Sequence, residues 1–525
     1  MKAFGQFSAW FAMRPRLSAF ALGILSAAAF RPLTIWPLAF LSIAGLIALV
    51  FQSSTVKRAT GLGWLFGFGH FTAGNIWIAQ AFTYQAEMPA ALGWAAVPLL
   101  ALYLALYPAL AAGTARWLMG DRRGWSAIAA FAACWIVSEW LRSWVFTGFP
   151  WNPLGAVLIG PFDRPGLAVL APWLGTYALS GLVVLLAGTG LWLARDRRIV
   201  PFAVLCVLVI AGMYVPSWQV ARDSTVHFTL VQPDIRQEKL NDPASFEENF
   251  IKTARLSLPD SPGQERLVLW PESGVPDYLR DGYPQRYYNH MTALGDPEFA
   301  RHRLARVVGE NSLLLTGTTD LDISDGRAVG ARNVVTAIDD TGNIRAGYAK
   351  AHLVPFGEYL ALRWLLEPLG GARLVAGTID FLPGPGPRTL DLGNYGQAGV
   401  QICYEIIFSG RITDPENRPD YIFNPSNDGW FGTIGPPQHL AQARLRAIEE
   451  GLPVLRATTT GISAVIDARG IVRQYRPLHV AGRIDGTVPA AAEPTLFSFL
   501  GNVLPLAWAI VLLLPTAVAI RRIGL

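Results

Sequence analysis

Three side chains in this sequence could together break an ester or an amide bond: a thiol, a carboxylate and an amine. Cys403, Glu272 and Lys350 each stand at the end of a short apolar run, where a buried strand would meet polar surroundings. A thiol in such a place suits a nucleophile. A carboxylate can take its proton, and an ammonium can stabilise the oxyanion of a tetrahedral intermediate. The three residues predict an enzyme, and their apolar surroundings predict a lipid substrate.

Each of the three residues also has a simpler explanation. Cys403 could be a buried apolar cysteine, as is expected of Cys134 and Cys206, which lie within long apolar stretches. Glu272 could lie on the surface after a proline turn, and Lys350 could be an ordinary solvated lysine. The combination of the three favours catalysis. The three cysteines form no disulfide framework, so they do not identify the redox compartment.

Composition divides the chain into three parts. It is 52% hydrophobic and only 15% charged, whereas soluble domains usually carry about 25% charged residues. Charges are sparse up to Val215, dense from Ser224 to Asp485, and sparse again afterwards. We therefore expect a transmembrane helical bundle of about seven spans over residues 1–220, a catalytic domain over 221–490 and a C-terminal transmembrane helix over 491–525.

Eight apolar stretches approach the roughly 20 residues that a transmembrane helix needs. They cover residues 17–31, 34–51, 61–83, 90–117, 125–147, 167–193, 199–215 and 497–519. Glu139 and Arg142 lie in the fifth stretch, where charges are costly in lipid. Their spacing of three residues on a helix predicts that they pair with each other.

Arginines and lysines gather at alternate turns between these stretches and thereby predict the orientation. These residues are Lys2, Arg14, Arg16, Lys57, Arg58, Arg116, Arg122, Arg123, Arg195, Arg197, Arg198, Arg521 and Arg522, whereas the other turns hold Arg31, Glu87, Asp163 and Arg164. The positive side of a membrane protein is cytoplasmic. We expect a multi-pass protein of the bacterial inner membrane, with both termini in the cytoplasm and the catalytic domain in the periplasm. No nucleic-acid partner is expected, because topology explains the basic residues.

Between residues 221 and 490, short apolar runs alternate with helical patterns, which indicates a layered α/β domain. The expected strands are His227–Gln232, Leu267–Trp270, Ser312–Gly317, Asn333–Ile338, Ala398–Cys403, Tyr421–Asn424, Val454–Thr458 and Ser463–Asp467. Ser245 and Glu248 have capping-box spacing. An amphipathic helix is expected from Gln438 to Glu450, ending at Gly451.

The motifs around the three reactive residues resemble those of the carbon–nitrogen hydrolase (nitrilase) superfamily: Trp270-Pro-Glu272, Lys350 and Cys403-Tyr-Glu405. With the apolar stretches included, the chain is similar to the membrane-integral apolipoprotein N-acyltransferase family. The further matching segments are Glu139–Arg142, Gly148–Trp151, Val231–Pro233, Lys350–Tyr359 and Asn424–Phe431. Family members often carry a tryptophan soon after Val-Gln-Pro, but this chain has Gln237–Asn241 there, so that residue's role is not carried over.

This resemblance implies an α-β-β-α sandwich and a Glu-Lys-Cys triad. Cys403 would take an acyl chain from a phospholipid, with phosphatidylethanolamine as the expected donor, and form a thioester. The acyl chain would then pass to the α-amine of the N-terminal diacylglyceryl-cysteine of an apolipoprotein. Such a ping-pong reaction needs no metal and no organic cofactor. Glu272 would be the general base and Lys350 the oxyanion partner.

Four further residues are expected to support this site. The resemblance implies that Glu358 holds Lys350 or the thiol region, although a simple ion pair in a loop is the alternative. Tyr404 and Glu405 flank Cys403 and are expected to position it. Asn333 could order the pocket or could serve turn formation at the start of a strand. His352 and His439 have no metal-ligand partner at a standard spacing and are interpreted as structural.

Two other functions stay open at the level of sequence. A membrane-tethered amidase or nitrilase would use water in place of the amine, and a transporter or scaffold would carry an inactive hydrolase domain. The segment from Tyr359 to Leu382 is also ambiguous. It is unusually apolar and is either a packed helix or a lid that contacts the bilayer.

Overall fold

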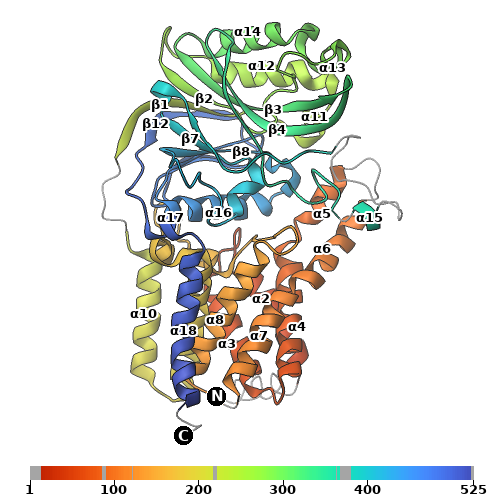
Figure 1. Ribbon diagram of the computed structural model, residues 1–525. Helices are drawn as coiled ribbons and strands as arrows, with labels where there is room; N and C mark the ends of the chain where they lie inside the picture. The colour runs from red at the N-terminus through yellow and green to blue at the C-terminus, as the bar shows by residue number, and fades with distance from the viewer. Residues whose placement is uncertain are drawn as a thin grey trace.

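The computed structural model describes residues 14–84, 90–120, 122–216, 222–361, 363–366 and 380–521. Helices form one end of the molecule, and two stacked β-sheets with their own helices form the other (Figure 1). This arrangement confirms a layered α/β domain joined to a helical region. Lys2, Glu87, Arg522 and residues 367–379 of the apolar segment lie outside the described residues.

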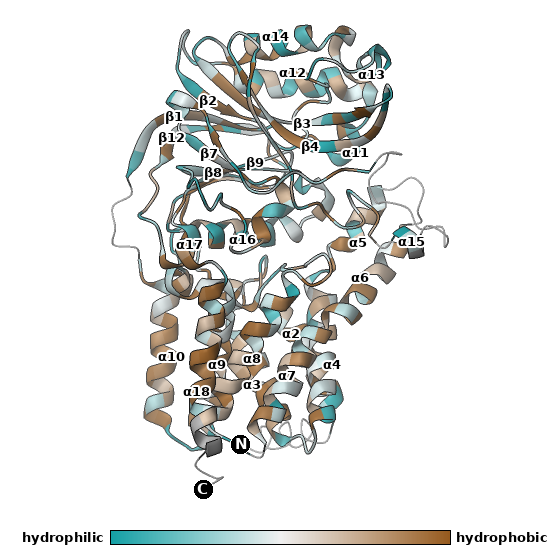
Figure 2. Cartoon of the chain, in the orientation of Figure 1, coloured by the Kyte–Doolittle hydropathy of each residue, from teal (hydrophilic) through white to brown (hydrophobic). Residues whose placement is uncertain are grey.

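The helical region contains at least one helix in each of the eight predicted apolar stretches. The longer helices are α2 (Pro15–Ala27), α3 (Pro37–Gln52), α4 (Val56–Gly74), α6 (Ala91–Leu104), α7 (Leu106–Met119), α8 (Trp125–Arg142), α9 (Ala171–Arg195), α10 (Ile199–Tyr214) and α18 (Val503–Arg521). Hydrophobic residues run along most of these helices (Figure 2). The fourth stretch holds two helices, and α6 leans away from the others (Figure 1).

The sequence predicted eight membrane spans, but fewer of these helices are long enough to cross a membrane. In the described part of the chain, Ala91–Met119 and Leu167–Arg195 are long and apolar enough. The shorter apolar helices are Pro15–Ala27, Pro37–Gln52, Ile199–Tyr214 and Val503–Ala517. The helices are present, but their lengths alone do not establish eight spans.

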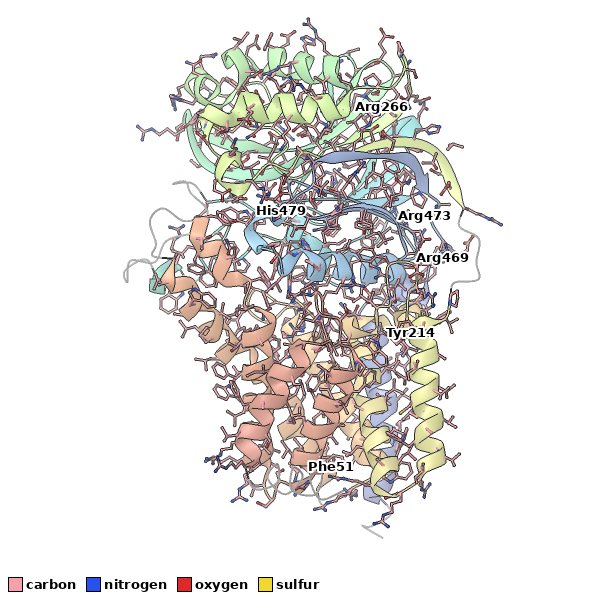
Figure 3. All side chains as sticks on the ribbon, turned by 180° about the vertical axis from the view of Figure 1, so that it is seen from behind. Phe51, Tyr214, Arg266, Arg469, Arg473 and His479 are labelled. Atoms are coloured by element: carbon pink, nitrogen blue, oxygen red, sulfur yellow. The ribbon has the colours of Figure 1, made fainter. Side chains whose placement is uncertain are left out.

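The basic turns gather at the end of the bundle that is remote from the sheets. Arg116 donates to the carbonyl of Ser53 over 3.0 Å, which joins the ends of α7 and α3. Figure 3 shows Phe51 at this remote end and Tyr214 near the sheets. The opposite turns contact the α/β domain, because Arg31 and Arg444 both donate to the carbonyl of Gly160.

The predicted ion pair between Glu139 and Arg142 is wrong. Glu139 accepts hydrogen bonds from the Trp135 indole, the Leu154 amide and the Ser180 hydroxyl. Arg142 donates to the carbonyls of residues 149 and 151. The two charged side chains therefore bind the backbone of the connection after α8 and do not form an ion pair with each other.

Two six-stranded sheets face each other across the apolar core of the α/β domain. The first has the order β12 (Gly482–Pro489), β1 (Asp223–Gln232), β2 (Arg266–Leu269), β3 (Ser312–Ser324), β4 (Arg327–Asp339), β5 (Ile344–Ala349). The second has the order β11 (Val472–Arg476), β10 (Ser463–Ile466), β9 (Val454–Thr458), β8 (Tyr421–Ser426), β7 (Gln397–Val400), β6 (Thr389–Asp391). The neighbours β1–β2–β3 and β7–β8–β9 are parallel.

Helices cover the outer faces of both sheets, which completes four layers. The first sheet carries α12 (Phe246–Ser257), α13 (Gln285–Met291) and α14 (Pro297–Val308), and the second carries α16 (Gly435–Glu450) (Figure 1). Since α16 lies between the second sheet and the bundle, nearly all of its residues are buried. The predicted amphipathic helix is thus covered on both faces. It ends at Gly451 as predicted, and Gly451 adopts the left-handed conformation.

Three local predictions need correction. β4 begins at Arg327, so Asn333 lies inside a strand and not at its start. β7 ends at Val400, and Cys403 opens a short 3-10 turn, η8 (Cys403–Ile407). Ser245 makes no cap bond to α12; its hydroxyl donates to Asp242 instead. Lys350 follows a strand as predicted, β5, whereas strands β6, β11 and β12 were not predicted.

Candidate active site

Glu272, Lys350 and Cys403 follow the ends of three different strands and are almost entirely buried. Glu272 follows β2, Lys350 follows β5 and Cys403 follows β7. Their exposed fractions are 6%, 1% and 4%. β2 and β5 belong to the first sheet and β7 to the second, so the stacking of the sheets brings these residues toward one another.

The Lys350 ammonium sits between two carboxylates. Its Nζ lies 3.0 Å from Oε1 of Glu358 and 3.4 Å from Oε1 of Glu272. Burial lowers the pKa of Lys350, but the charges of Glu358 and Glu272 outweigh burial and raise this pKa above its ordinary value. Lys350 is therefore a fixed cation.

Both oxygens of Glu272 accept hydrogen bonds. Oε1 accepts from Nδ2 of Asn333 over 2.7 Å, and Oε2 accepts from the Asn427 amide over 2.7 Å. The same Asn333 nitrogen also donates to Glu358 over 3.0 Å. Asn333 thus bridges the two carboxylates that hold Lys350, so its side chain belongs to this cluster and not to a turn.

Cys403 combines burial with an unusual backbone conformation. Its φ angle is +51°, in the left-handed region that non-glycine residues seldom adopt. Burial, reinforced by the charge of Glu272, raises the pKa of the Cys403 thiol well above its ordinary value, although Lys350 acts in the opposite direction. The thiol form of Cys403 is therefore favoured over the thiolate. Such a thiol needs a base at the moment of attack.

Glu405 binds four donors and joins the chain segments that carry Lys350 and Cys403. Its Oε1 accepts from the Tyr348 hydroxyl and from the amides of Ala351 and His352, at 2.8–3.0 Å. Its Oε2 accepts from the Ile402 amide over 2.8 Å. Burial raises the pKa of Glu405 to about 7. Glu405 therefore aligns two strand ends.

Tyr404 and His352 connect the site to the helical region. The Tyr404 hydroxyl donates to the carbonyl of Gly148 over 3.3 Å. His352 Nε2 lies 3.1 Å from the carbonyl of Thr147, and its ring lies against Phe408. Tyr404 thus anchors the turn after β7, and His352 the segment after β5, to the connection that follows α8.

Sequence reasoning missed the residues of the connection after β8 and their partners. Asn427 was part of a matching motif but had no assigned role, and it binds Glu272 as described. Gln237 Oε1 accepts from Nδ2 of Asn427 over 2.8 Å, so this residue supports the same connection. His439 and Arg456 lie behind it, fully buried. The only sequence signal for these residues was the polar motif Asn424–Phe431.

Comparisons with known proteins agree for both parts of the chain. A family model described as the apolipoprotein N-acyltransferase N-terminal domain matches residues 22–189, and a carbon-nitrogen hydrolase model matches 229–477. An apolipoprotein N-acyltransferase of Rhodopseudomonas palustris is 35% identical over 95% of this chain and 94% of its own length. An apolipoprotein N-acyltransferase of Bradyrhizobium diazoefficiens is 33% identical over 96% of this chain and 94% of its own length. An amidase of the nitrilase superfamily from Nesterenkonia AN1 covers 51% of this chain and 93% of its own, with 20% identity and a TM-score of 0.36.

Proposed function

Because this chain belongs to the apolipoprotein N-acyltransferase family, we propose that Cys403 carries the acyl group, with Glu272 as its base and Lys350 as its oxyanion partner. The chain is an acyltransferase with a carbon-nitrogen hydrolase domain. The observation that supports these roles is the buried cluster in which the Lys350 ammonium touches Glu272 near Cys403.

In the first half-reaction, Glu272 takes the thiol proton while Sγ of Cys403 attacks the ester carbonyl of a phospholipid. The carbonyl oxygen becomes an oxyanion, which the Lys350 ammonium stabilises. When the intermediate collapses, the carbon–oxygen bond breaks and the leaving alkoxide takes the proton from Glu272. The products are a Cys403 thioester and a lysophospholipid, and we propose phosphatidylethanolamine as the donor.

In the second half-reaction, the α-amine of the diacylglyceryl-cysteine attacks the thioester carbonyl. Glu272 takes a proton from this amine, Lys350 again stabilises the oxyanion, and the carbon–sulfur bond breaks. The proton returns to the Cys403 sulfur, and the apolipoprotein leaves with a new amide. Burial of the three residues limits access by water, which favours transfer over hydrolysis.

A single reaction mixture tests this function against the hydrolase alternative. The purified protein is placed in vesicles of phosphatidylethanolamine with a peptide that begins with diacylglyceryl-cysteine. Mass spectrometry is expected to show one added acyl chain per peptide and an equal amount of lysophospholipid. Free fatty acid without acylated peptide would instead identify a membrane-tethered hydrolase.

We further propose that residues 1–220 and 491–525 span the inner membrane and that residues 221–490 lie in the periplasm. Two observations support this arrangement. The basic turns lie at the end of the bundle remote from the sheets, and the sparsely charged turns contact α16. Under the positive-inside rule the remote end is cytoplasmic, so both termini are cytoplasmic.

The topology predicts opposite signals from two reporter fusions. A reporter that is active only in the periplasm is expected to be silent after Leu525 and active when inserted next to Asn241. A reporter that is active only in the cytoplasm is the matched control and should give the reverse pattern. A periplasmic signal at Leu525 would contradict the orientation.

We also propose that lipid enters beside α15 (Arg363–Leu366). Trp364 in this helix is 76% exposed, and Arg363 and Asp380 form an ion pair next to it. Figures 1 and 3 place α15 beside the outer end of α6. We expect Trp364→Ser to slow acylation of Cys403 from vesicle phospholipid several-fold, because an exposed tryptophan there can insert into the bilayer surface.

The control for this variant is Leu294→Ser, which removes another exposed apolar side chain (82% exposed) far from the bundle. Transfer from a short-chain soluble ester should be unchanged in both variants, because such a donor does not enter from a bilayer. Equal rates of Trp364→Ser and Leu294→Ser with vesicle phospholipid would mean that α15 is not part of the lipid path.

A further inference from the structure

The carbonyl group of Cys403 is held by a buried histidine that lies outside the Glu-Lys-Cys cluster. His439 Nε2 lies 3.1 Å from the Cys403 carbonyl oxygen. The imidazole is fully buried on α16. The rings of Trp151 and Phe431 lie against it, with centroids at 5.3 and 5.7 Å. These contacts leave the ring little freedom to turn away from Cys403.

The surroundings of His439 determine which nitrogen carries its proton. The carbonyl of Cys403 can only accept, so the bond at Nε2 requires a proton there. Nδ1 lies 3.0 Å from Nη2 of Arg456, which can only donate, and 3.0 Å from Oδ1 of Asp428, which can only accept. Burial and the charge of Arg456 lower the pKa of His439, although Asp428 opposes this effect. The Cys403 carbonyl therefore requires a proton on Nε2, whichever of the two groups Nδ1 bonds to.

A buried ion pair fixes this histidine in turn. Arg456 Nη2 donates to both oxygens of Asp428, at 2.8 and 2.7 Å. Its Nη1 donates to Ser426 and to Asn424 on the neighbouring strand β8. Asp428 directly follows Asn427, the residue whose amide binds Glu272. One short connection therefore supports both the base and the histidine.

The bond from His439 acts on a strained part of the backbone. A residue other than glycine in the left-handed region is disfavoured and persists only where its surroundings enforce it. Cys403 has this conformation, with φ at +51°. Glu405 holds the Ile402 amide on one side, and His439 holds the Cys403 carbonyl on the other. His439 thus fixes the peptide group that follows the Cys403 Cα, and Glu405 fixes the peptide group that precedes Ile402.

We propose that His439 is a positioning residue for the nucleophile: its Nε2–H holds the Cys403 carbonyl and so keeps the thiol in line with Glu272 and Lys350. This inference rests on the proposed role of Cys403. His439 does not touch the reacting atoms, because it binds the backbone and not the sulfur. It revises the structural role that the sequence predicted for this histidine.

The test compares variants that differ in where they place a donor. His439→Gln puts an amide nitrogen near the former Nε2 position. His439→Asn is too short to reach the carbonyl, and His439→Leu keeps comparable bulk but has no donor. Single-turnover acylation by vesicle phospholipid gives the rate of thioester formation and its dependence on phospholipid. Alkylation of Cys403 by iodoacetamide, mapped by peptide mass, gives a second readout without a lipid.

We expect His439→Leu to slow acylation about 100-fold at saturating phospholipid, as is typical for a misplaced reacting group. The phospholipid concentration for half-maximal rate should not change, and His439→Gln should stay within several-fold of the wild type. Equal losses in His439→Leu and His439→Gln, or normal rates in both, would overturn the proposal. A histidine that only fills space would give equal losses, because both variants alter the packing.

If His439→Leu does not fold, the comparison of His439→Gln with His439→Asn tests whether His439 positions Cys403. The glutamine variant should be faster in both acylation and alkylation, and equal rates would overturn the proposal. A wild-type protein that gains no acyl mass would instead refute the proposed function. In that case the alkylation rates still show whether His439 positions the Cys403 thiol, so the two failures are distinguishable.

Discussion

A Cys403→Ala variant is expected to form no thioester and to lose apolipoprotein acylation by about 10⁴-fold or more, as is typical when a nucleophile is removed. Alanine has no atom that can accept the acyl group. The substitution removes one sulfur atom, while the bonds that join Glu272, Lys350 and Asn333 do not involve this sulfur. The variant should therefore still fold in the membrane.

The mass of the intact protein checks this prediction. After incubation with phosphatidylethanolamine, the wild type should gain the mass of one acyl chain, which hydroxylamine removes, and Cys403→Ala should gain none. Cys134→Ala and Cys206→Ala are matched controls, because they remove the other two cysteines and should acylate normally. An acyl label on any other residue would mean that the nucleophile is assigned wrongly.

The strand ends that carry the reactive residues could be predicted because the signal for them is local. A short apolar run followed by Glu272 or Cys403 is visible within a few residues. The contacts between Lys350, Glu358 and Glu272 could not be predicted from spacing alone, because they depend on the strand order of the first sheet, in which β3 and β4 lie between β2 and β5. Only the resemblance to a known family brought these residues into one expected site.

Two misread elements show how distant contacts override local patterns. The first half of β4, from Arg327 to Arg332, was not predicted as a strand, but it pairs with the last residues of β3. The helix α16 was predicted to be amphipathic. Arg444 and Arg446 are nevertheless buried, because they bind carbonyl and side-chain groups of the helical region.

Residues that act on the backbone leave no motif for sequence analysis to find. Glu405 and His439 serve the site through amides and a carbonyl, groups that every residue carries. Their value depends on a left-handed Cys403, which cannot be read from its neighbours. The position of Glu405 next to the nucleophile predicted a supporting role, whereas nothing near His439 in the sequence linked it to Cys403.

Lys350→Met is expected to slow thioester formation about 10³-fold, a loss comparable to removing an oxyanion donor. Methionine nearly fills the space of the lysine but carries no charge. The variant also brings Glu272 and Glu358 face to face without a cation, so one of them will tend to take up a proton. Rapid-quench measurement of the acyl-enzyme tests this loss. Lys239→Met is the control, because that lysine is exposed and pairs with Glu248.

The two effects of Lys350→Met can be separated by a second substitution. Lys350→Met combined with Glu358→Gln removes one cation and one carboxylate. The net charge of the cluster then equals that of the wild type, so Glu272 can stay ionised. If Lys350 stabilises the oxyanion, this double variant will remain as slow as Lys350→Met alone, although its thermal stability should recover in part. Recovery of normal acylation would contradict the oxyanion role and would mean that Lys350 serves only to keep Glu272 charged.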